Sequence, residues 1–217
     1  MHASVQDSSG SIPPPILGPE SAGRVESMRD ELEAAAPQYL LYARVNTLRL
    51  SVDAAVAQLR DEGWQELAPL GAEAQCEGAL ALIGASRGDA RDHQARRCFS
   101  RDHLLNDVLA FPAGCSALRT CALVAHGSMI IQDRASCAVA HVLASAPPLQ
   151  GTFRFDIIDA CAAPGKKAAH AAALTRKRCG RVFAFDVDAV RTQRMLTLVQ
   201  QLGASRVAGG KGDFLSL

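Results

Sequence analysis

The chain has 217 residues, of which 48% are hydrophobic, and its net charge is +1. This length suits one large or two small domains, and the apolar content is enough for a buried core. Seven cysteines, an odd number without a Cys-x-x-Cys spacing, argue against a disulfide framework and a zinc site. A polar N-terminus and the lack of an apolar run of about 20 residues argue against a signal peptide and a membrane span. We therefore expect a soluble intracellular protein without a metal.

The charge is unevenly distributed. Residues 153–217 carry a net +6, whereas residues 1–152 carry −5. A basic C-terminal part permits a nucleic-acid partner without requiring one. On charge alone we prefer the simpler interpretation, a solvated helix face.

The first hundred residues predict a leader and a small α+β module. Ser51 is a suitable N-cap for an amphipathic helix with Val52, Ala55, Val56 and Leu59 on one face. The other expected elements are a mobile leader over 1–25, a helix over 27–36, strands over 39–50 and 79–84, and an Arg-rich loop over 85–100. The module as a whole is expected to span residues 26–100.

Residues 101–150 predict a connecting segment, and residues 151–217 a regular α/β unit. In the connecting segment we expect a helical turn over 104–111, a strand over 128–132 and a helix over 135–144, before the breaker Pro147-Pro148. Beyond it, strands alternate with helices, which indicates a parallel sheet with right-handed crossovers. These elements are expected at 153–159, 164–178, 181–187, 188–202 and 205–212. The fold class is therefore α/β, with a Rossmann-like sheet that is only partly present.

The first loop of this unit has the composition of a cofactor pocket. It reads Asp159-Ala-Cys-Ala-Ala-Pro-Gly-Lys-Lys167, and small side chains let a cofactor lie against the backbone. It has neither Gly-x-Gly-x-x-Gly nor a Walker pattern, which argues against a pyrophosphate ligand. One glycine, Gly165, and a carboxylate at the end of the next strand, Asp186, suit an adenosine cofactor without phosphates. S-adenosyl-L-methionine is the usual cofactor of that kind.

Asp186 has two possible roles. Its carboxylate can accept hydrogen bonds from both ribose hydroxyls at the carboxyl end of its strand. It could instead cap the helix over 188–202, but Asp188 is better placed for that role. We therefore predict that Asp186 binds the cofactor.

Other residues near the loop have simpler explanations. Cys161 has no base beside it in the sequence, so we expect it to pack rather than react. His170 is expected on the buried face of its helix. Lys166 and Lys167 oppose the helix dipole, and for them a phosphate contact and a solvated turn are equal alternatives.

Five segments resemble, in the right order, the Sun-domain RNA (cytosine-C5) methyltransferase family. The loop resembles the family's cofactor motif, which usually reads Cys-Ala-Ala-Pro-Gly-x-Lys-Thr. The segments are Ala43–Leu48 (a signature of the N-terminal RNA-binding region), Ile131–Cys137, Asp159–Lys167, Phe183–Asp188 with Arg191, and Gly212–Leu215. The motif sequences most resemble those of the nucleolar branch that methylates large-subunit ribosomal RNA, and the similarity covers residues 39–217.

The resemblance implies a set of cofactor contacts. They fall in the loop and after the next two strands, on Cys161, Ala162, Ala163, Pro164, Gly165, Lys166, Lys167, Asp186, Arg191 and Asp213. Two departures from the family pattern matter little, since Lys166 stands where asparagine is common and Ala168 where threonine is common.

The resemblance also implies two catalytic cysteines, and neither of their motifs occurs in this sequence. They are the fourth motif, Asp-Pro-Pro-Cys or Asp-Pro-Ser-Cys, and the sixth, with Thr-Cys, both expected beyond Leu217. Because C5 of cytosine is a poor nucleophile, a thiolate must first add at C6. Cys137 and Cys179 are not expected near the pocket. We therefore assign no catalytic residue and expect that the chain, apparently truncated, does not transfer a methyl group alone.

The expected function of the parent protein is methylation of a cytosine C5 in large-subunit ribosomal RNA. S-adenosyl-L-methionine is the expected cofactor, ribosomal RNA the partner, and the nucleus and nucleolus the location, with the cytoplasm as the alternative. Two rival functions remain: a non-catalytic RNA-binding or ribosome-assembly protein, and a methyltransferase for protein or small molecules. With three of about seven strands, the sheet is expected to leave an apolar edge uncovered, so we expect the chain to be insoluble or molten alone.

Overall fold

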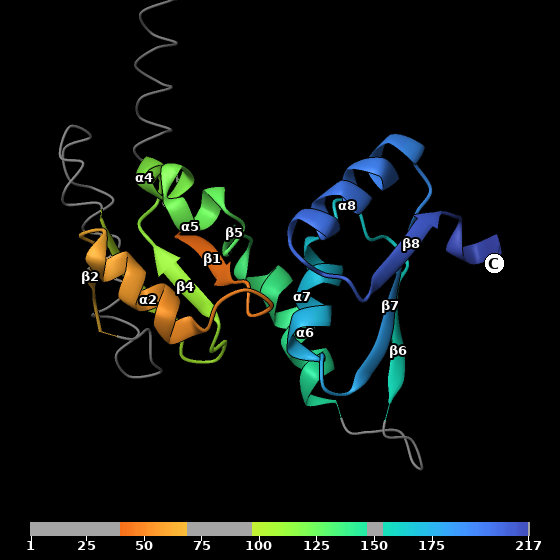
Figure 1. The fold of residues 1–217 in the computed structure, drawn as a ribbon, viewed down its shortest axis with the longest axis horizontal. Coiled ribbons are helices and arrows are strands. Elements are labelled where there is room, and N and C mark those ends of the chain that lie inside the picture. Colours follow the sequence, from red (N-terminus) through yellow and green to blue (C-terminus); the bar gives the residue numbers. More distant parts are fainter. Residues whose placement is uncertain (1–39, 69–96, 147–153, 217) are drawn as a thin grey trace, which may run out of the picture. The chain divides into compact units, whose positions relative to one another are not determined.

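The computed structural model describes residues 40–68, 97–146 and 154–216, all of which lie in one compact unit, Gln38–Leu217 (Figure 1). The expected leader over 1–25, the helix over 27–36 and the strand over 79–84 lie outside the described residues. Within the described ranges, no helix is long and apolar enough to cross a bilayer.

The first half of this unit contains a five-stranded sheet in the order β2-β3-β4-β1-β5. The strands pair antiparallel except for β2 with β3, and β1 lies between β4 and β5, with Ala43 opposite Leu109 on one side and Ile131 on the other. The bounds are β1 Leu41–Val45, β2 Gln65–Glu66, β3 Cys98–Arg101, β4 Val108–Phe111 and β5 Met129–Ile131.

Within the described residues, three helices accompany this sheet: α2 (Val52–Asp61), α4 (Ser116–Thr120) and α5 (Ala122–Ala125). The predicted cap of α2 is confirmed, because the Ser51 side chain accepts a hydrogen bond from the Ala54 amide, and Ala55, Val56 and Leu59 are buried as expected. These side chains form a core with Trp64 and with the sheet residues Phe99 and Phe111.

The sequence predictions were wrong in two places within this sheet. Residues 108–111 form the strand β4 rather than part of a helical turn, and β3 begins inside the segment expected as a loop. All four residues of β4 are buried between β3 and β1. A short apolar run of this kind has no periodicity that separates helix from strand. The sheet continues past residue 100, since β4 and β5 pair with β1.

The second half confirms the predicted α/β unit. Strands β6 (Phe155–Asp159), β7 (Cys179–Asp186) and β8 (Val207–Lys211) form a parallel sheet in that order, connected by α7 (Lys166–Leu174) and α8 (Ala189–Gln201). The preceding helix α6 (Arg134–Ser145), also as predicted, packs against α7.

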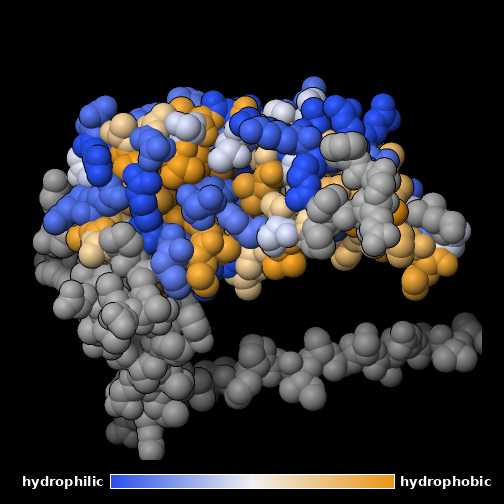
Figure 2. Space-filling view, turned by 90° about the horizontal axis from the view of Figure 1, so that it is seen from below, coloured by the Kyte–Doolittle hydropathy of each residue, from blue (hydrophilic) through white to orange (hydrophobic). Residues whose placement is uncertain are grey.

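The core of this half is made largely of small residues. Alanines at 168, 169, 171 and 172 on α7 pack with Val182 and Ala184 of β7 and with Met195 and Val199 of α8. Among the described strands β6 pairs only with β7, and Ile158 on it is exposed. Figure 2 shows apolar residues in several patches separated by hydrophilic ones.

Candidate cofactor site

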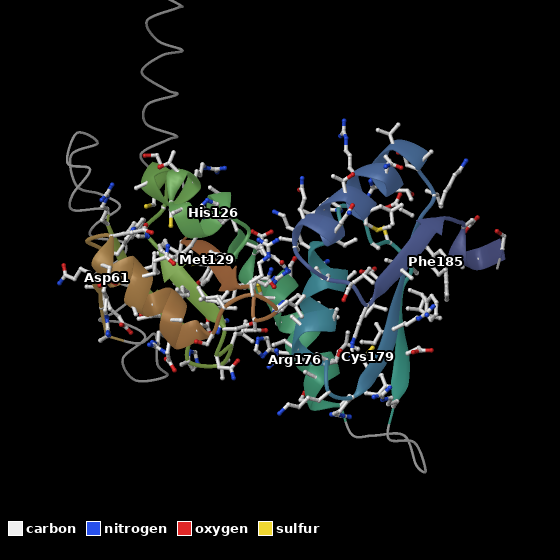
Figure 3. The ribbon with its side chains drawn as sticks, viewed as in Figure 1. Asp61, His126, Met129, Arg176, Cys179 and Phe185 are labelled. Carbon is white, nitrogen blue, oxygen red and sulfur yellow. The ribbon has the colours of Figure 1, made fainter. Side chains whose placement is uncertain are left out.

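The loop between β6 and α7 closes onto the carboxyl end of β7. The Ala162 amide donates to the Phe185 carbonyl over 2.9 Å, and the Ala163 amide donates to the Asp186 carboxylate over 3.3 Å. In Figure 3, Cys179 and Phe185 mark the amino and carboxyl ends of β7. The predicted loop and the predicted carboxylate therefore lie together at the edge of the sheet where such folds bind ligands.

Gly165 is required at the end of this loop for two reasons. Its φ is +99°, a conformation that residues with a side chain rarely adopt. A Cβ atom there would also lie 3.0 Å from side-chain carbons of both Met195 and Val199 on α8. The glycine thus lets α7 begin close against α8 and fixes where the loop lies.

Asp186 is buried, and both of its carboxylate oxygens are engaged. Oδ1 accepts from the Asp188 amide over 3.1 Å, and Oδ2 accepts from the Ala163 amide and pairs with Arg191 Nη2 over 3.2 Å. A carboxylate has about four acceptor positions. Three of these positions are taken, one of them by the half-exposed Arg191.

Asp188 has its expected role, and Arg191 and Asp213 lie near the loop and after β8, respectively. Asp188 is the N-cap of α8, accepting from the Arg191 amide over 2.7 Å, so the prediction that it rather than Asp186 caps this helix is confirmed. Arg191 also donates to the Ala163 carbonyl over 3.3 Å and so joins α8 to the loop. Asp213 follows β8 and is exposed, where it accepts from the Leu215 amide.

The structure contradicts the prediction that Cys161 packs in the core. Cys161 is exposed and lines a cavity of about 390 Å³ together with the rest of the loop. The chain turns outward as β6 ends, and the Cys161 amide donates to the carboxylate of Asp159. Burial raises the pKa of that carboxyl above its usual value. The other walls of the cavity are Leu40–Tyr42, Ile131–Asp133 and Ser136.

Lys166 contacts a backbone carbonyl, which neither of the two sequence alternatives foresaw. Its Nζ donates to the Ile131 carbonyl of β5 over 2.8 Å, and its own carbonyl accepts from Arg44 Nη2 over 3.1 Å. Arg44 is fully buried on β1, and its Nε donates to the Gln132 side chain over 3.0 Å. The sequence analysis missed Arg44 and Gln132, because their partners lie far away along the chain.

The segment Ala43–Leu48 therefore forms a joint between the two sheets. Asn46, also buried, donates through Nδ2 to the carbonyls of Gly127 (3.0 Å) and Leu202 (2.9 Å), at the end of α8. Arg49 donates to the carbonyls of His126 and Gln201. Because Arg44 and Asn46 are enclosed by protein, they are not available for direct contact with RNA.

A third contact joins the two halves at Asp107, which precedes β4. One carboxylate oxygen lies 2.6 Å from His141 Nε2 on α6, and the other 2.8 Å from His170 Nε2 on α7. Burial acts to raise the pKa of Asp107, but the hydrogen bonds and charges of the two histidines outweigh it and hold this pKa below its usual value. An ionised carboxylate only accepts, so both histidines donate through Nε2.

The same three side chains have the composition of a metal site. Their ligand atoms lie within 4.8 Å of one another, close enough to share an ion. However, separations of 2.6 and 2.8 Å are hydrogen-bond lengths, and ligands around one zinc ion lie farther apart. We therefore interpret the cluster as a hydrogen-bonded joint. His170 is buried, as predicted, and burial lowers its pKa.

The two cysteines considered as substitutes for a catalytic thiol are both buried and protonated. Burial raises the pKa of Cys137 to about 12, and it also raises the pKa of Cys179. Cys179 begins β7, at the edge of the sheet opposite the loop (Figure 3). A nucleophile needs thiolate character and access, and these two residues have neither.

Comparisons with known proteins match both halves. A family model for the ferredoxin-like domain of NOL1/NOP2/Sun domain family member 5 matches residues 39–132, and a model for the 16S rRNA methyltransferase RsmB/F matches residues 148–215. The chain is 36% identical to a 28S rRNA (cytosine-C(5))-methyltransferase of Mus musculus, over 81% of this chain and 33% of the relative. It is 30% identical to the 25S rRNA (cytosine-C(5))-methyltransferase NSUN5 of Arabidopsis thaliana, over 81% of this chain and 24% of the relative.

Solved structures support the fold. A methyltransferase homolog protein from Pyrococcus horikoshii, 22% identical, superposes with a TM-score of 0.54 over 82% of this chain and 45% of that chain. NSun6 from Pyrococcus horikoshii, solved with SFG and 18% identical, gives a TM-score of 0.50 over 88% of this chain and 62% of that chain. The chain thus spans a third or less of the length of the two curated relatives and about half of the solved proteins.

Proposed function

Because the chain belongs to the Sun-domain family of RNA (cytosine-C5) methyltransferases, we propose that it provides the cofactor site of an enzyme that methylates a cytosine C5 in large-subunit ribosomal RNA. The curated relatives are named for this reaction, and both parts of the family pattern occur in order in one compact unit. The observation that carries the proposal is the closure of the loop onto Asp186 at the carboxyl end of β7.

The cofactor in this proposal is S-adenosyl-L-methionine, which supplies a methyl group activated by its sulfonium. The loop backbone of residues 161–165 and the Asp186 carboxylate bind its adenosine part, and Arg191 and Asp213 stand beside it. In support, NSun6 of Pyrococcus horikoshii was solved with SFG, an analogue of this cofactor. The loop holds the cofactor through small residues because a larger side chain would occupy the space of the ligand.

The cavity of about 390 Å³ lies on the exposed side of the loop and suits the RNA substrate. A cytosine must be unpaired or turned out of its stack before a side chain can reach C6. Lys167 and Cys161 are exposed in the loop, and the buried Gln132 contributes an amide Nε2 without a hydrogen-bond partner among the described residues. We place the target base at this opening, within reach of the methyl group.

The cellular setting in this proposal is the nucleolus, because large-subunit ribosomal RNA is made there, and a role in ribosomal RNA processing accompanies it. Binding measurements with RNA and with S-adenosylhomocysteine distinguish the two rival functions from the proposed one. A non-catalytic assembly protein binds RNA and no S-adenosylhomocysteine. A methyltransferase for protein or small molecules binds S-adenosylhomocysteine and no RNA.

Calorimetry with S-adenosylhomocysteine tests the site. We expect Asp186→Ala to weaken binding at least tenfold, about 1.4 kcal/mol, since a charge-assisted hydrogen bond contributes about 1.5–3 kcal/mol. Asp156→Ala is the matched control, because this carboxylate accepts from the Arg181 amide at the amino edge of the same sheet. Its affinity should equal that of the unmodified chain.

A second ligand separates a ribose contact from a general weakening of the loop. The 2′-deoxy analogue of S-adenosylhomocysteine should bind more weakly than the parent ligand to the unmodified chain. In Asp186→Ala the two ligands should bind with the same affinity. If the analogue loses the same affinity in both proteins, Asp186 does not bind the ribose. An unchanged affinity in Asp186→Ala would remove the cofactor assignment altogether.

A further inference from the structure

A second and larger cavity, of about 740 Å³, lies between the first sheet and the end of α8. One wall comes from α4, α5 and β5, and the other from the last turn of α8. His126 and Met129, both labelled in Figure 3, lie on the first wall. The complete lining is Arg49, Arg119, Val124–Gly127, Met129–Ile131, Lys166, Leu198, Gln201 and Leu202. We call this cavity the basic groove.

The basic groove is lined by cations, and its described lining includes no carboxylate. Arg49 and Lys166 are held by hydrogen bonds to backbone carbonyls, the former by His126 and Gln201 and the latter by Ile131. A carbonyl carries no net charge, so none of these contacts is an ion pair. The groove is therefore a region of positive potential with fixed cations.

Three other arginines in the same half form ion pairs, whereas Arg97, outside the groove, donates to the Glu62 carbonyl. Arg60 and Arg101 pair with Glu66, and Arg134 pairs with Asp102. Arg119, by contrast, is exposed and forms no ion pair with the described residues. Arg49, Arg119 and Lys166 thus lie along one groove without an ion pair to the described residues.

The cations of the groove have donors to spare. A guanidinium carries five N–H groups and an ammonium three. Arg49 uses its two Nη atoms for one carbonyl each, and Lys166 uses one of its three protons. Phosphate oxygens accept such bonds well, and the partly exposed apolar side chains of Val124 and Leu198 offer surfaces for a sugar or base between them.

The basic groove adjoins the opening at the cofactor loop. Ile131 and Lys166 line both the groove and the smaller cavity. A chain that lies in the groove along β5 therefore reaches the loop directly past Lys166. A duplex presents its phosphates on the outside of a wide cylinder and cannot enter such a groove, whereas a single strand can.

We propose that the basic groove binds the phosphodiester backbone of single-stranded RNA and leads the target nucleotide to the cofactor loop. This inference rests on the proposed function and names the surface through which it would contact its substrate. Arg119 is the entry contact, Arg49 the middle contact, and Lys166 the contact next to the loop.

The test compares two exposed arginines that differ in position. Arg119→Ala removes a cation of the groove, and Arg194→Ala removes one from α8 that lines neither cavity. A labelled single-stranded RNA of about 12 nucleotides is titrated at several salt concentrations. Each lost phosphate contact should reduce the slope of log K against log salt by about 0.7, which corresponds to about fivefold weaker binding at 0.1 M salt.

We expect this loss for Arg119→Ala, recovery of the slope in Arg119→Lys, and no change for Arg194→Ala. The inference is overturned if Arg119→Ala keeps the slope of the unmodified chain, if Arg194→Ala loses as much, or if no single-stranded RNA binds. Tighter binding of a matched duplex than of the single strand would overturn it equally.

Calorimetry with S-adenosylhomocysteine on the same proteins keeps the two proposals apart. Arg119→Ala should bind this ligand like the unmodified chain, because Arg119 lies outside the loop. If S-adenosylhomocysteine does not bind at all while the RNA results are as expected, the cofactor site fails and the groove stands. If S-adenosylhomocysteine binds but the RNA results are not as expected, the cofactor site stands and the groove proposal fails.

Discussion

Arg44 and Asn46 lie two positions apart at the end of β1 and bind two different helices of the second half. Arg44 donates to the carbonyl of Lys166 at the start of α7, directly after the cofactor loop. Asn46 donates to the carbonyl of Leu202 at the end of α8. Both are buried, and both connect the two sheets, but only the first connection touches the candidate site.

The two connections also differ in charge. Asn46 is neutral and satisfies two carbonyls, as an amide can. Arg44 brings a charge into the interior, where burial lowers its pKa to about 10 while the negative charge of Asp107 partly compensates it. The cofactor loop is thus held by a buried charge, which costs more free energy to bury than the neutral amide of Asn46. Removal of this charge leaves several groups unpaired. The first half is therefore part of the support of the cofactor loop, because Arg44 on β1 binds the residue that follows the loop.

The largest effect is expected from Arg44→Met. The change leaves the Lys166 carbonyl and the Gln132 side chain without their donor and removes a charge that compensates Asp107. We expect the free energy of unfolding to fall by about 3–5 kcal/mol. Urea denaturation measures this loss, and Arg44→Lys, which keeps the charge without the planar fork, should lose less. A loss under about 1 kcal/mol would contradict the role of Arg44.

Asn46→Ala should cost less and leave the loop unchanged. Two carbonyls lose a buried partner, so we expect a fall of about 2 kcal/mol in the free energy of unfolding. At temperatures where both variants are folded, affinity for S-adenosylhomocysteine should fall in Arg44→Lys but not in Asn46→Ala. Amide hydrogen exchange at Ala163 and Gly165 should separate them in the same way. Equal effects of both changes on the loop would remove the distinction between the two connections.

Acid should weaken the Asp107 joint selectively. The folded-state pKa of His170 is lowered by burial, so the unfolded chain binds its proton first, and stability falls as the pH drops below about 6.5. The folded-state pKa of Asp107 is also lowered, so its contribution is present above about pH 4 and is lost at lower pH. Urea midpoints between pH 7.5 and 5 should therefore decline less in His170→Gln. An identical decline would exclude His170 as the source.

The smallest effect is expected at the exposed rim. Arg176 donates to the Thr47 carbonyl over 3.4 Å and is exposed, so Arg176→Ala should change the free energy of unfolding by less than about 0.5 kcal/mol. This variant sets the baseline for the buried connections. A loss comparable to that of Asn46→Ala would mean that the interface is held by its rim.

The sequence by itself determined the elements whose signals are local. The Ser51 and Asp188 caps act within three residues, and the alternation of strands and helices after residue 153 repeats over short distances. The cofactor loop was equally predictable, since small residues, one glycine and an acid after the next strand follow from the space that a ligand needs. The positions of these elements were therefore readable without their tertiary partners.

Only the tertiary structure decided which residues join the halves. The groups to which the Arg44 and Asn46 side chains donate, and the histidines bound by Asp107, lie 34 or more residues away along the chain, so no spacing in the sequence indicates them. For the same reason β4 was mistaken for a helical turn, because its strand character comes from its neighbours β3 and β1. Cys161 was predicted to pack, yet it is exposed, since the direction in which a loop leaves its strand depends on what the loop then contacts. Local periodicity specifies an element, whereas burial and hydrogen-bond partners are set by the chain segments that meet it in space.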